Sequence, residues 1–339
     1  MLRSILSLPD QCRTGYEAGR NTAPLPDALG ISSIVVCGMG GSGIVGDVVQ
    51  ALYRDRLGVP LSVVKDPVLP GFCGRDTLVI CSSFSGNTQE TLACYDEASE
   101  RGSRTIALTS GGELAGRASE RGAAVITIPG DVPAPRAAFG YLVFGALGAL
   151  EAMGIVPALA EDVVETVRVL AELSTELGPG RDHQALRLAT ELEGHVPVIW
   201  GAEGIGSVAA ARWKTELNEN AKVPAFSSSL PELDHNEVVG WEERAGERFF
   251  LIVLRHGFEH PDVAARIPAS VQIAESSGLT AREVQHRGES RVAQLLSLVM
   301  LGGVTSVCLA FLRGRDPTPI EAIDRLKRTL AEERQLRWE

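Results

Sequence analysis

Two glutamates and a histidine in the second half of the chain have residue types and spacing suited to proton transfer. Glu216, Glu219 and Asn220 lie at positions i, i+3 and i+4 of an expected helix, so they share one helical face. A serine-rich stretch, expected to be a loop, then leads to His235. A carboxylate and an imidazole joined by one short connection are suited to paired proton transfer. Most glutamates on helices are solvated, so each residue alone indicates little.

Two turns in the first half of the chain are suited to holding an anion. Gly38–Gly43 (GMGGSG) and Ser83–Thr88 (SFSGNT) each follow an apolar, strand-like run and precede a helical segment. Glycines allow a tight turn, and the N–H groups at a helix N-terminus attract negative charge. Ser83, Ser85 and Thr88 add hydroxyls. Simple helix capping needs only one such residue, so the pattern favours a phosphate site without a lysine.

The first glycine run also fits a different function. Gly38, Gly40 and Gly43 match the dinucleotide pattern GxGxxG, and Asp66 follows Gly43 by 66 − 43 = 23 residues, near the end of the next expected strand. A nicotinamide-dependent dehydrogenase is therefore an alternative. It would leave the Ser83–Thr88 turn without a role, and the glycine motif alone is weak.

Arg136 is a third candidate for a functional site. It follows Pro133 and Pro135 and enters a long apolar segment, Ala137–Leu150. An arginine so close to apolar sequence needs a partner. The spacing does not decide between a structural salt bridge and a place in a binding site.

Composition excludes several classes of function. The chain has 339 residues, with 32 Lys and Arg against 43 Asp and Glu, and the net charge of 32 − 43 = −11 argues against a general nucleic-acid binder. Its six cysteines form no CxxC pair and no Cys/His group with zinc spacing, so we expect reduced thiols, no metal site and a cytoplasmic protein. The apolar run Leu295–Leu312 contains glycines and hydroxyl residues, which favours a buried helix over a membrane span.

The order of strands and helices predicts an α/β fold with two parallel sheets. Continuous apolar, β-branched runs alternate with helical segments, a pattern typical of parallel sheets covered on both faces. The expected strands are 33–37, 61–64, 77–82, 105–108 and 124–128, then 195–200, 249–254 and 279–284. We predict two doubly wound domains, residues 1–156 and 191–339, joined by a helical linker over 157–190. A last helix is expected from residue 320 to about residue 334.

Taken together, these motifs resemble one family, the bifunctional phosphoglucose/phosphomannose isomerases, which carry two sugar-isomerase (SIS) domains. The matching strings follow one another along most of the chain. They are GMGGSG at 38–43, SFSGNT at 83–88, PRAAFGY at 135–141, ELNENAK at 216–222, PELDHNE at 231–237 and DPTPIEAIDRLK at 316–327. SGNT is broadly typical of SIS domains, whereas the segments around Glu219 and His235 indicate this isomerase branch. The resemblance implies two SIS-type domains.

The resemblance also implies a role for each candidate residue. The residues that would hold the 6-phosphate of a sugar are Gly41, Ser42, Ser83, Ser85 and Thr88. Glu219 would move a proton between C1 and C2 through a cis-enediolate, and Arg136 would stabilise the developing negative oxygen. His235 would assist ring opening, supplied by the neighbouring subunit of a homodimer, and Lys327 matches a lysine near the ring oxygen. No cofactor and no metal is implied, and no nucleic acid or membrane is expected as a partner.

Two functions other than isomerisation stay open at this point. A non-catalytic SIS protein that binds a sugar phosphate as a regulator would use only the phosphate turns, and it would leave Glu219, His235 and Arg136 unexplained. The dehydrogenase would use only the first glycine run. Glucose 6-phosphate and mannose 6-phosphate differ only in configuration at C2, so both are candidate substrates.

Overall fold

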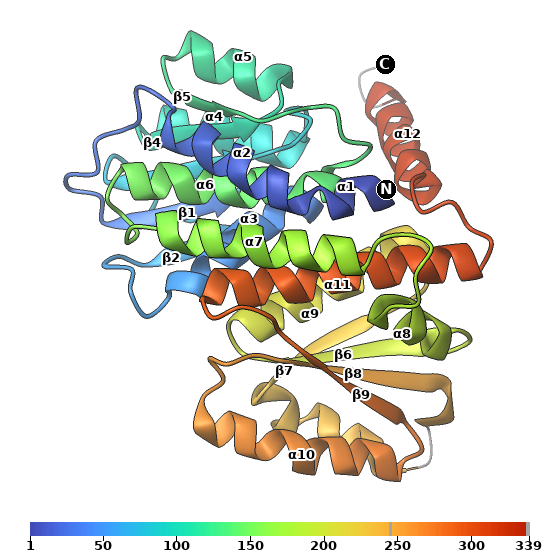
Figure 1. Ribbon diagram of the computed structural model, residues 1–339. Coiled ribbons are helices and arrows are strands. Elements are labelled where there is room, and N and C mark those ends of the chain that lie inside the picture. The colour runs from blue at the N-terminus through green and yellow to red at the C-terminus, as the bar shows by residue number, and fades with distance from the viewer. Residues whose placement is uncertain (244–245, 337–339) are drawn as a thin grey trace.

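The first half of the chain folds into a five-stranded parallel sheet with the strand order β2-β1-β3-β4-β5 (Figure 1). Its strands are β1 (Ser33–Cys37), β2 (Leu61–Val64), β3 (Thr77–Ser82), β4 (Arg104–Thr109) and β5 (Ala124–Thr127). Successive residues of a strand point to opposite faces, so Ile34 and Val36 join one apolar cluster and Val35 and Cys37 another. The computed structural model describes residues 1–243 and 246–336.

Helices cover both faces of this sheet, as the continuous apolar strands predicted. One face packs against α4 (Gln89–Glu100) and α5 (Gly112–Glu120). The other packs against α2 (Leu8–Arg20), α3 (Gly40–Tyr53) and α6 (Phe139–Ala152). Cys37 and Cys81 are buried free thiols, as expected.

The second half forms a four-stranded parallel sheet with the order β7-β6-β8-β9. Its elements are β6 (Val196–Ala202), α9 (Ile205–Glu216), β7 (Phe226–Leu230), β8 (Phe249–Arg255), α10 (Pro261–Ser276) and β9 (Thr280–Gln285). The order repeats that of the first four strands of the other sheet, with β6 in the place of β1 and β8 in the place of β3. The α/β fold with two doubly wound parallel sheets is therefore confirmed.

One strand of the second sheet differs from the expectation. The serine-rich stretch before His235, expected to be a loop, contains β7, which pairs in parallel with Val198–Ala202. Serines carry little strand signal because they compete with the backbone for hydrogen bonds. Here β6 supplies the backbone partners, and β7 forms the edge of the sheet.

A layer of long helices separates the two sheets (Figure 1). Helices α2 and α6 pack so closely that a Cβ on Gly19 would lie 2.0 Å from the carbonyl oxygen of Gly145. Helix α7 (Ala160–Glu176), expected within a linker, contacts both α2 and α11 (Arg291–Leu312). Among the described residues, α11 is the helix long and apolar enough to cross a membrane, yet most of it is buried in the protein, as predicted.

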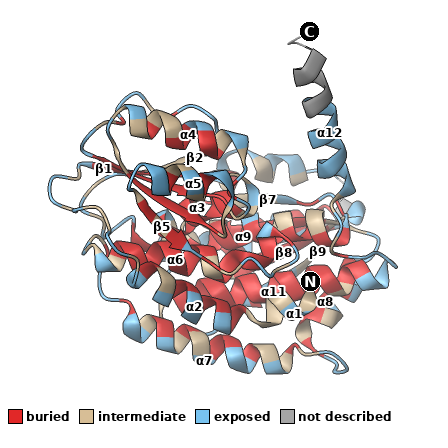
Figure 2. Ribbon diagram, turned by 90° about the horizontal axis from the view of Figure 1, so that it is seen from above, coloured by how far each residue is buried: buried red, intermediate tan, exposed pale blue. Residues whose placement is uncertain are grey.

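The remaining elements are short, apart from the last helix. They are α1 (Leu2–Leu6), α8 (Gln184–Leu192), η1 (Pro135–Ala138), η2 (Leu217–Ala221), η3 (Glu232–His235), η4 (Glu237–Trp241) and η5 (Gly246–Arg248). Helix α12 (Glu321–Leu336) extends away from the rest of the protein (Figure 2). It exposes Ile323, Leu326 and Leu330, which recur along the helix at spacings of three and four residues.

Candidate active site

Glu219 lies on a single π-helical turn rather than on the regular helix that the spacing predicted. Helix α9 ends at Glu216, and η2 continues it with the wider π geometry. The turn ends at Lys222, which has a left-handed backbone with φ 58°. π turns often occur at functional sites because they redirect side chains. As a result, Glu216 is buried, whereas the Glu219 side chain keeps 25% of its surface exposed.

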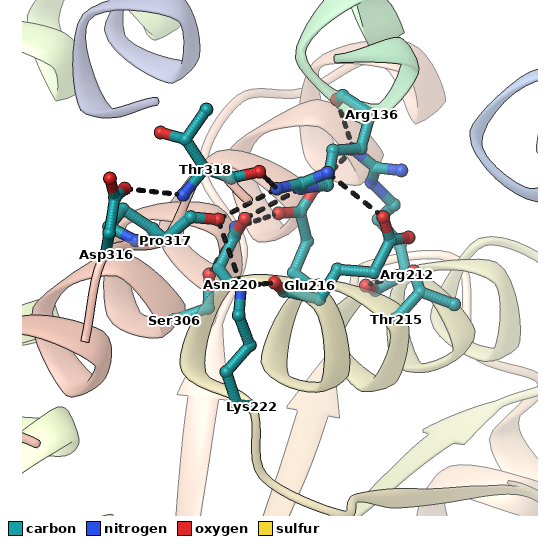
Figure 3. Close-up of polar contacts among 11 residues, drawn as sticks. Arg136, Arg212, Thr215, Glu216, Asn220, Lys222, Ser306, Asp316, Pro317 and Thr318 are labelled. Atoms are coloured by element: carbon teal, nitrogen blue, oxygen red, sulfur yellow. Dashed lines mark hydrogen bonds and ion pairs between the residues drawn. The ribbon is translucent and has the colours of Figure 1, made fainter. Parts of the chain in front are cut away.

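Arg136 points from η1 towards this turn and makes an ion pair with Glu219. Its side chain is only 1% exposed, and its Nη1 donates to Oε2 of Glu219 over 3.1 Å. Its other donors bind Oδ1 of Asn220 at 2.8 Å and the carbonyl oxygens of Pro317 and Thr318 at 2.8 and 2.9 Å (Figure 3). Arg136 therefore makes a salt bridge, as one interpretation expected, and its partner is Glu219, the candidate base of the other interpretation.

Lys222 is a site residue that the sequence did not indicate. Its ammonium donates to the carbonyl oxygen of Glu219 and, at 3.4 Å, to that of Pro317. Burial, followed by the charge of Arg136, lowers the pKa of Lys222. A left-handed turn at a lysine has no sequence signature, so only the three-dimensional structure identifies this residue.

A pocket of about 620 Å³ opens beside Glu219. Its wall is formed by the π turn, including Asn218 and Lys222, and by the segment from Arg313 to Ile323 that leads into α12. The volume falls within the range of small-molecule sites, about 300–1,000 Å³. Glu219 therefore presents its carboxylate to a space that a small ligand can occupy.

The two turns of the predicted phosphate site lie together. The Oγ of Ser42 accepts a hydrogen bond from the N–H of Phe84 at 3.0 Å, which ties the first turn to the second. The hydroxyls of Ser83 and Thr88 are 3.0 Å apart, and the Oγ of Ser85 accepts from the N–H of Asn87 at 3.2 Å. Thr88 occupies the N-cap of α4 without a side-chain capping bond. Simple capping by Thr88 is therefore not its role in this structure.

The predicted phosphate site adjoins Arg136 through Gly41. A Cβ on Gly41 would lie 3.1 Å from the backbone nitrogen and 3.2 Å from the Cα of Arg136. Such contacts are tighter than most side chains tolerate, so glycine permits α3 to begin against η1. The N-terminus of α3 therefore lies against the backbone of Arg136, whose side chain extends to Glu219.

The corresponding loop of the second half, after β8, has its anion-binding groups already occupied. The carboxylate of Glu259 accepts from the N–H of His256 at 3.0 Å and from Arg255 at 2.9 Å. The N–H of Gly257 donates to Oε1 of Gln294 at 2.8 Å, and that of Phe258 donates to Nδ1 of His256. An internal carboxylate fills this loop, so the first half is the better place for an external phosphate.

His235 and Lys327 are not brought to Glu219 by the described part of this chain. His235 ends η3 with an exposed side chain. Lys327 is exposed on α12, the helix that extends from the body of the protein. Across residues 1–243 and 246–336, neither makes a hydrogen bond or ion pair with Glu219 or Arg136. The same ranges contain no group of three or more His, Cys, Asp or Glu that could hold a metal ion.

Comparison with known proteins places the chain among sugar-phosphate enzymes. The family described as bacterial phospho-glucose isomerase C-terminal SIS domain matches residues 181–330. A bifunctional phosphoglucose/phosphomannose isomerase of Caldicellulosiruptor bescii is 37% identical, over 98% of this chain and 99% of its own. One from Aquifex aeolicus is 35% identical, over 90% and 92%. The C-terminal domain of glucosamine-fructose-6-phosphate aminotransferase from Francisella tularensis shares the fold, with a TM-score of 0.70, 16% identity and coverage of 94% and 98%.

Proposed function

Because the chain belongs to the family of bifunctional phosphoglucose/phosphomannose isomerases, we propose that Glu219 and Arg136 form the reactive centre of its isomerase site. The enzyme interconverts glucose 6-phosphate and mannose 6-phosphate with fructose 6-phosphate. The observation that supports the proposal best is the 3.1 Å contact between a partly exposed carboxylate and a buried guanidinium beside a pocket. The direct test is a coupled assay of the purified protein with each of the two aldose 6-phosphates.

The reaction needs one base that can reach two neighbouring carbons. Glu219 takes the proton from C2 of the open-chain aldose, which gives a cis-enediolate, and returns it to C1, while the proton of the C2 hydroxyl passes to the oxygen of C1. Negative charge then develops on the oxygens of C1 and C2. The guanidinium of Arg136 is buried and held in place, so it stabilises the negative charge on these oxygens without reorganisation. Neither step calls for a metal or a nucleotide.

The 6-phosphate is proposed to bind where α3 and α4 begin. The groups assigned to it are Gly41, Ser42, Ser83, Ser85 and Thr88. Both helices start without a side-chain capping bond at the N-cap, which leaves N–H donors for an anion. A non-catalytic regulator would need only these phosphate-binding turns, so turnover in the assay distinguishes an isomerase from a regulator.

Ser83→Ala, Ser85→Ala and Thr88→Val are each expected to raise the KM for sugar 6-phosphates roughly 10- to 100-fold. A hydrogen bond to a charged group contributes about 1.5–3 kcal/mol, and each change removes one. Steady-state kinetics on fructose 6-phosphate measures the effect. Ser99→Ala is the matched control, because Ser99 lies on α4 and its hydroxyl donates to the carbonyl of Tyr95 within the same helix. Unchanged KM values in all three variants would contradict the proposal that the 6-phosphate binds at these turns.

A second copy of the chain is proposed to complete the site. Helix α12 exposes an apolar stripe of Ile323, Leu326 and Leu330, which a partner subunit would cover. His235 and Lys327 are exposed and, in the part of the chain that the structure describes, make no hydrogen bond or ion pair with Glu219 or Arg136, so we propose that they act in the site of a partner subunit. In a symmetric homodimer, His235 would assist ring opening in the neighbouring site, and Lys327 would lie near the ring oxygen.

Mixing inactive Glu219→Gln chains with inactive His235→Ala chains is expected to restore part of the activity. One of the two sites in a mixed dimer would then hold both wild-type groups. The measurement is the specific activity of purified mixed dimers, isolated with two different affinity tags. Failure of rescue in such dimers would show that the two residues act within one chain.

Domain limits and compartment follow as further proposals. We assign one SIS-type unit to residues 1–156 and the other to residues 191–339, because each contains one sheet, and we assign 157–190 to the helices between them. The cytoplasm fits the six free cysteines and the buried position of α11. No nucleic acid or membrane partner is assigned, in line with the net charge of −11.

A further inference from the structure

Behind the reactive pair lies a second, fully buried ion pair. The side chains of Arg212 and Glu216 are 3% and 4% exposed, and they form a salt bridge one helical turn apart on α9. Arg212 also donates to the backbone carbonyl of Arg136 at 2.6 Å, and its guanidinium lies 4.8 Å from the ring centre of Phe139. The pair therefore holds the backbone of the residue whose side chain faces Glu219.

Asn220 joins the two ion pairs. Its Nδ2 donates to Oε2 of Glu216 and, at 3.0 Å, to the Oγ of Ser306. Its Oδ1 accepts from Nε of Arg136 at 2.8 Å (Figure 3). Asn220 is fully buried, so water does not compete for these bonds. An amide is the side chain that fits between a carboxylate and a guanidinium, since it donates to one and accepts from the other.

These contacts determine which nitrogen of the Arg136 guanidinium faces Glu219. Its Nε is bound to Asn220, and its Nη2 is bound to the carbonyls of Pro317 and Thr318. Only Nη1 points to Glu219. The guanidinium is planar, so fixing two of its nitrogens fixes the direction of the third.

We propose that Asn220 and Glu216 are positioning residues, which hold the π turn and aim Nη1 of Arg136 at Glu219 and at the reacting oxygen. The inference rests on the proposed roles of Arg136 and Glu219. Glu216 acts through Asn220 on the side chain of Arg136 and through Arg212 on its backbone. Neither Asn220 nor Glu216 needs to touch the substrate.

A purely structural role and a positioning role differ in their effect on the charge around Glu219. Among the described residues, the charged groups close to Glu219 are Arg136 and Lys222 on the positive side and Glu216 on the negative side. Asp316 and Glu321 lie near Lys222, and the pocket wall also carries two arginines, Arg313 and Arg315. A like charge added beside a carboxylate makes it harder to ionise, and removing one makes it easier. Changes at Asn220 and Glu216 should therefore move the pH dependence of the reaction in opposite directions.

The test compares Asn220→Asp with Glu216→Gln. Asn220→Asp keeps the shape but gives Arg136 two carboxylates to share, so we expect kcat to fall at least tenfold and the acid limb of kcat/KM to move to higher pH by about half a unit or more. Glu216→Gln removes a negative charge, so its acid limb is expected to move to lower pH. The KM is expected to stay within about threefold in both, because neither residue belongs to the proposed phosphate-binding turns.

Three controls keep the result interpretable. Thr215→Val changes a neighbouring residue of α9 whose hydroxyl donates to the backbone carbonyl of Arg212, and it is expected to leave the pH profile unchanged. Asn220→Ser removes the bridge without adding charge, and it is expected to lower kcat at unchanged KM even if a charged variant fails to fold. Circular dichroism and thermal melting select folded variants.

Unshifted pH profiles together with kcat within threefold of wild type, in folded variants, would overturn the inference. Lower stability alone, with normal kcat in the folded protein, would overturn it as well, because it would reduce the network to a structural one. Failure here is distinct from failure of the proposed function. If Glu219→Gln stays active, the reactive centre is wrong. If Glu219→Gln is inactive but Asn220→Asp and Asn220→Ser behave like wild type, only the positioning role is wrong.

Discussion

Glu219→Gln is expected to lower kcat by more than about 10²-fold and to leave the KM for sugar 6-phosphates nearly unchanged. The change keeps size and hydrogen bonding but removes the base, and a positioned general base contributes about 10²–10⁴-fold. Binding is expected to persist because the residues proposed to hold the phosphate lie at the start of α3 and in the turn before α4, outside the π turn. The measurement is the steady-state rate with glucose 6-phosphate and mannose 6-phosphate.

The control for this variant has to be chosen with the structure in view. Glu216→Gln would be the obvious control from the sequence, but Glu216 is buried, pairs with Arg212, and has a pKa raised by that burial. Glu203→Gln is the better choice, because Glu203 lies just before the N-terminus of α9, at the end away from Glu219, and pairs with Arg54 at the surface. Wild-type kcat in Glu219→Gln would place the shared base on another residue.

Arg136→Lys is expected to lower kcat by about 10²–10³-fold, the usual effect of losing one preorganised donor to a developing oxyanion. A lysine keeps the charge but offers a point rather than a planar fork. It cannot bind Asn220, two carbonyls and Glu219 together as Arg136 does. The carbonyls of Pro317 and Thr318 would lose a buried partner, so the melting temperature is expected to fall as well.

Rates and thermal melts of Arg136→Lys measure the two effects separately. Arg54→Lys serves as the control, because Arg54 makes an exposed pair with Glu203 over 3.4 Å and such pairs contribute little. A rate within fivefold of wild type for Arg136→Lys would mean that charge alone suffices at this position. The fork geometry would then have no part in catalysis.

The strands of the first sheet could be predicted closely, and the reason is physical. The runs at 33–37, 61–64 and 77–82 coincide with β1, β2 and β3, because strands covered on both faces are apolar without interruption. The run at 195–200 overlaps β6 (Val196–Ala202), and the run at 249–254 falls within β8 (Phe249–Arg255). By contrast, β7 escaped prediction because a serine-rich edge strand has no such signal.

The candidate site could be predicted in part. Glu219 and Arg136 were selected from motifs, and the structure brings them into contact although 83 residues separate them. The carbonyls of Pro317 and Thr318, 181 and 182 residues from Arg136, could not be predicted, since backbone oxygens carry no sequence signal. The role of Lys222 depends on a left-handed turn, and the bridge by Asn220 depends on burial among three elements.

One carboxylate is proposed to move one proton between C1 and C2. The most direct test follows [2-²H]glucose 6-phosphate and [2-²H]mannose 6-phosphate in ordinary water by NMR. We expect both to give fructose 6-phosphate with part of the deuterium on C1 and the rest in the solvent, since a shielded base returns some of the label before exchange. Absence of product from both sugars would contradict isomerisation, and complete retention of deuterium on C1 would contradict proton transfer and indicate a hydride shift.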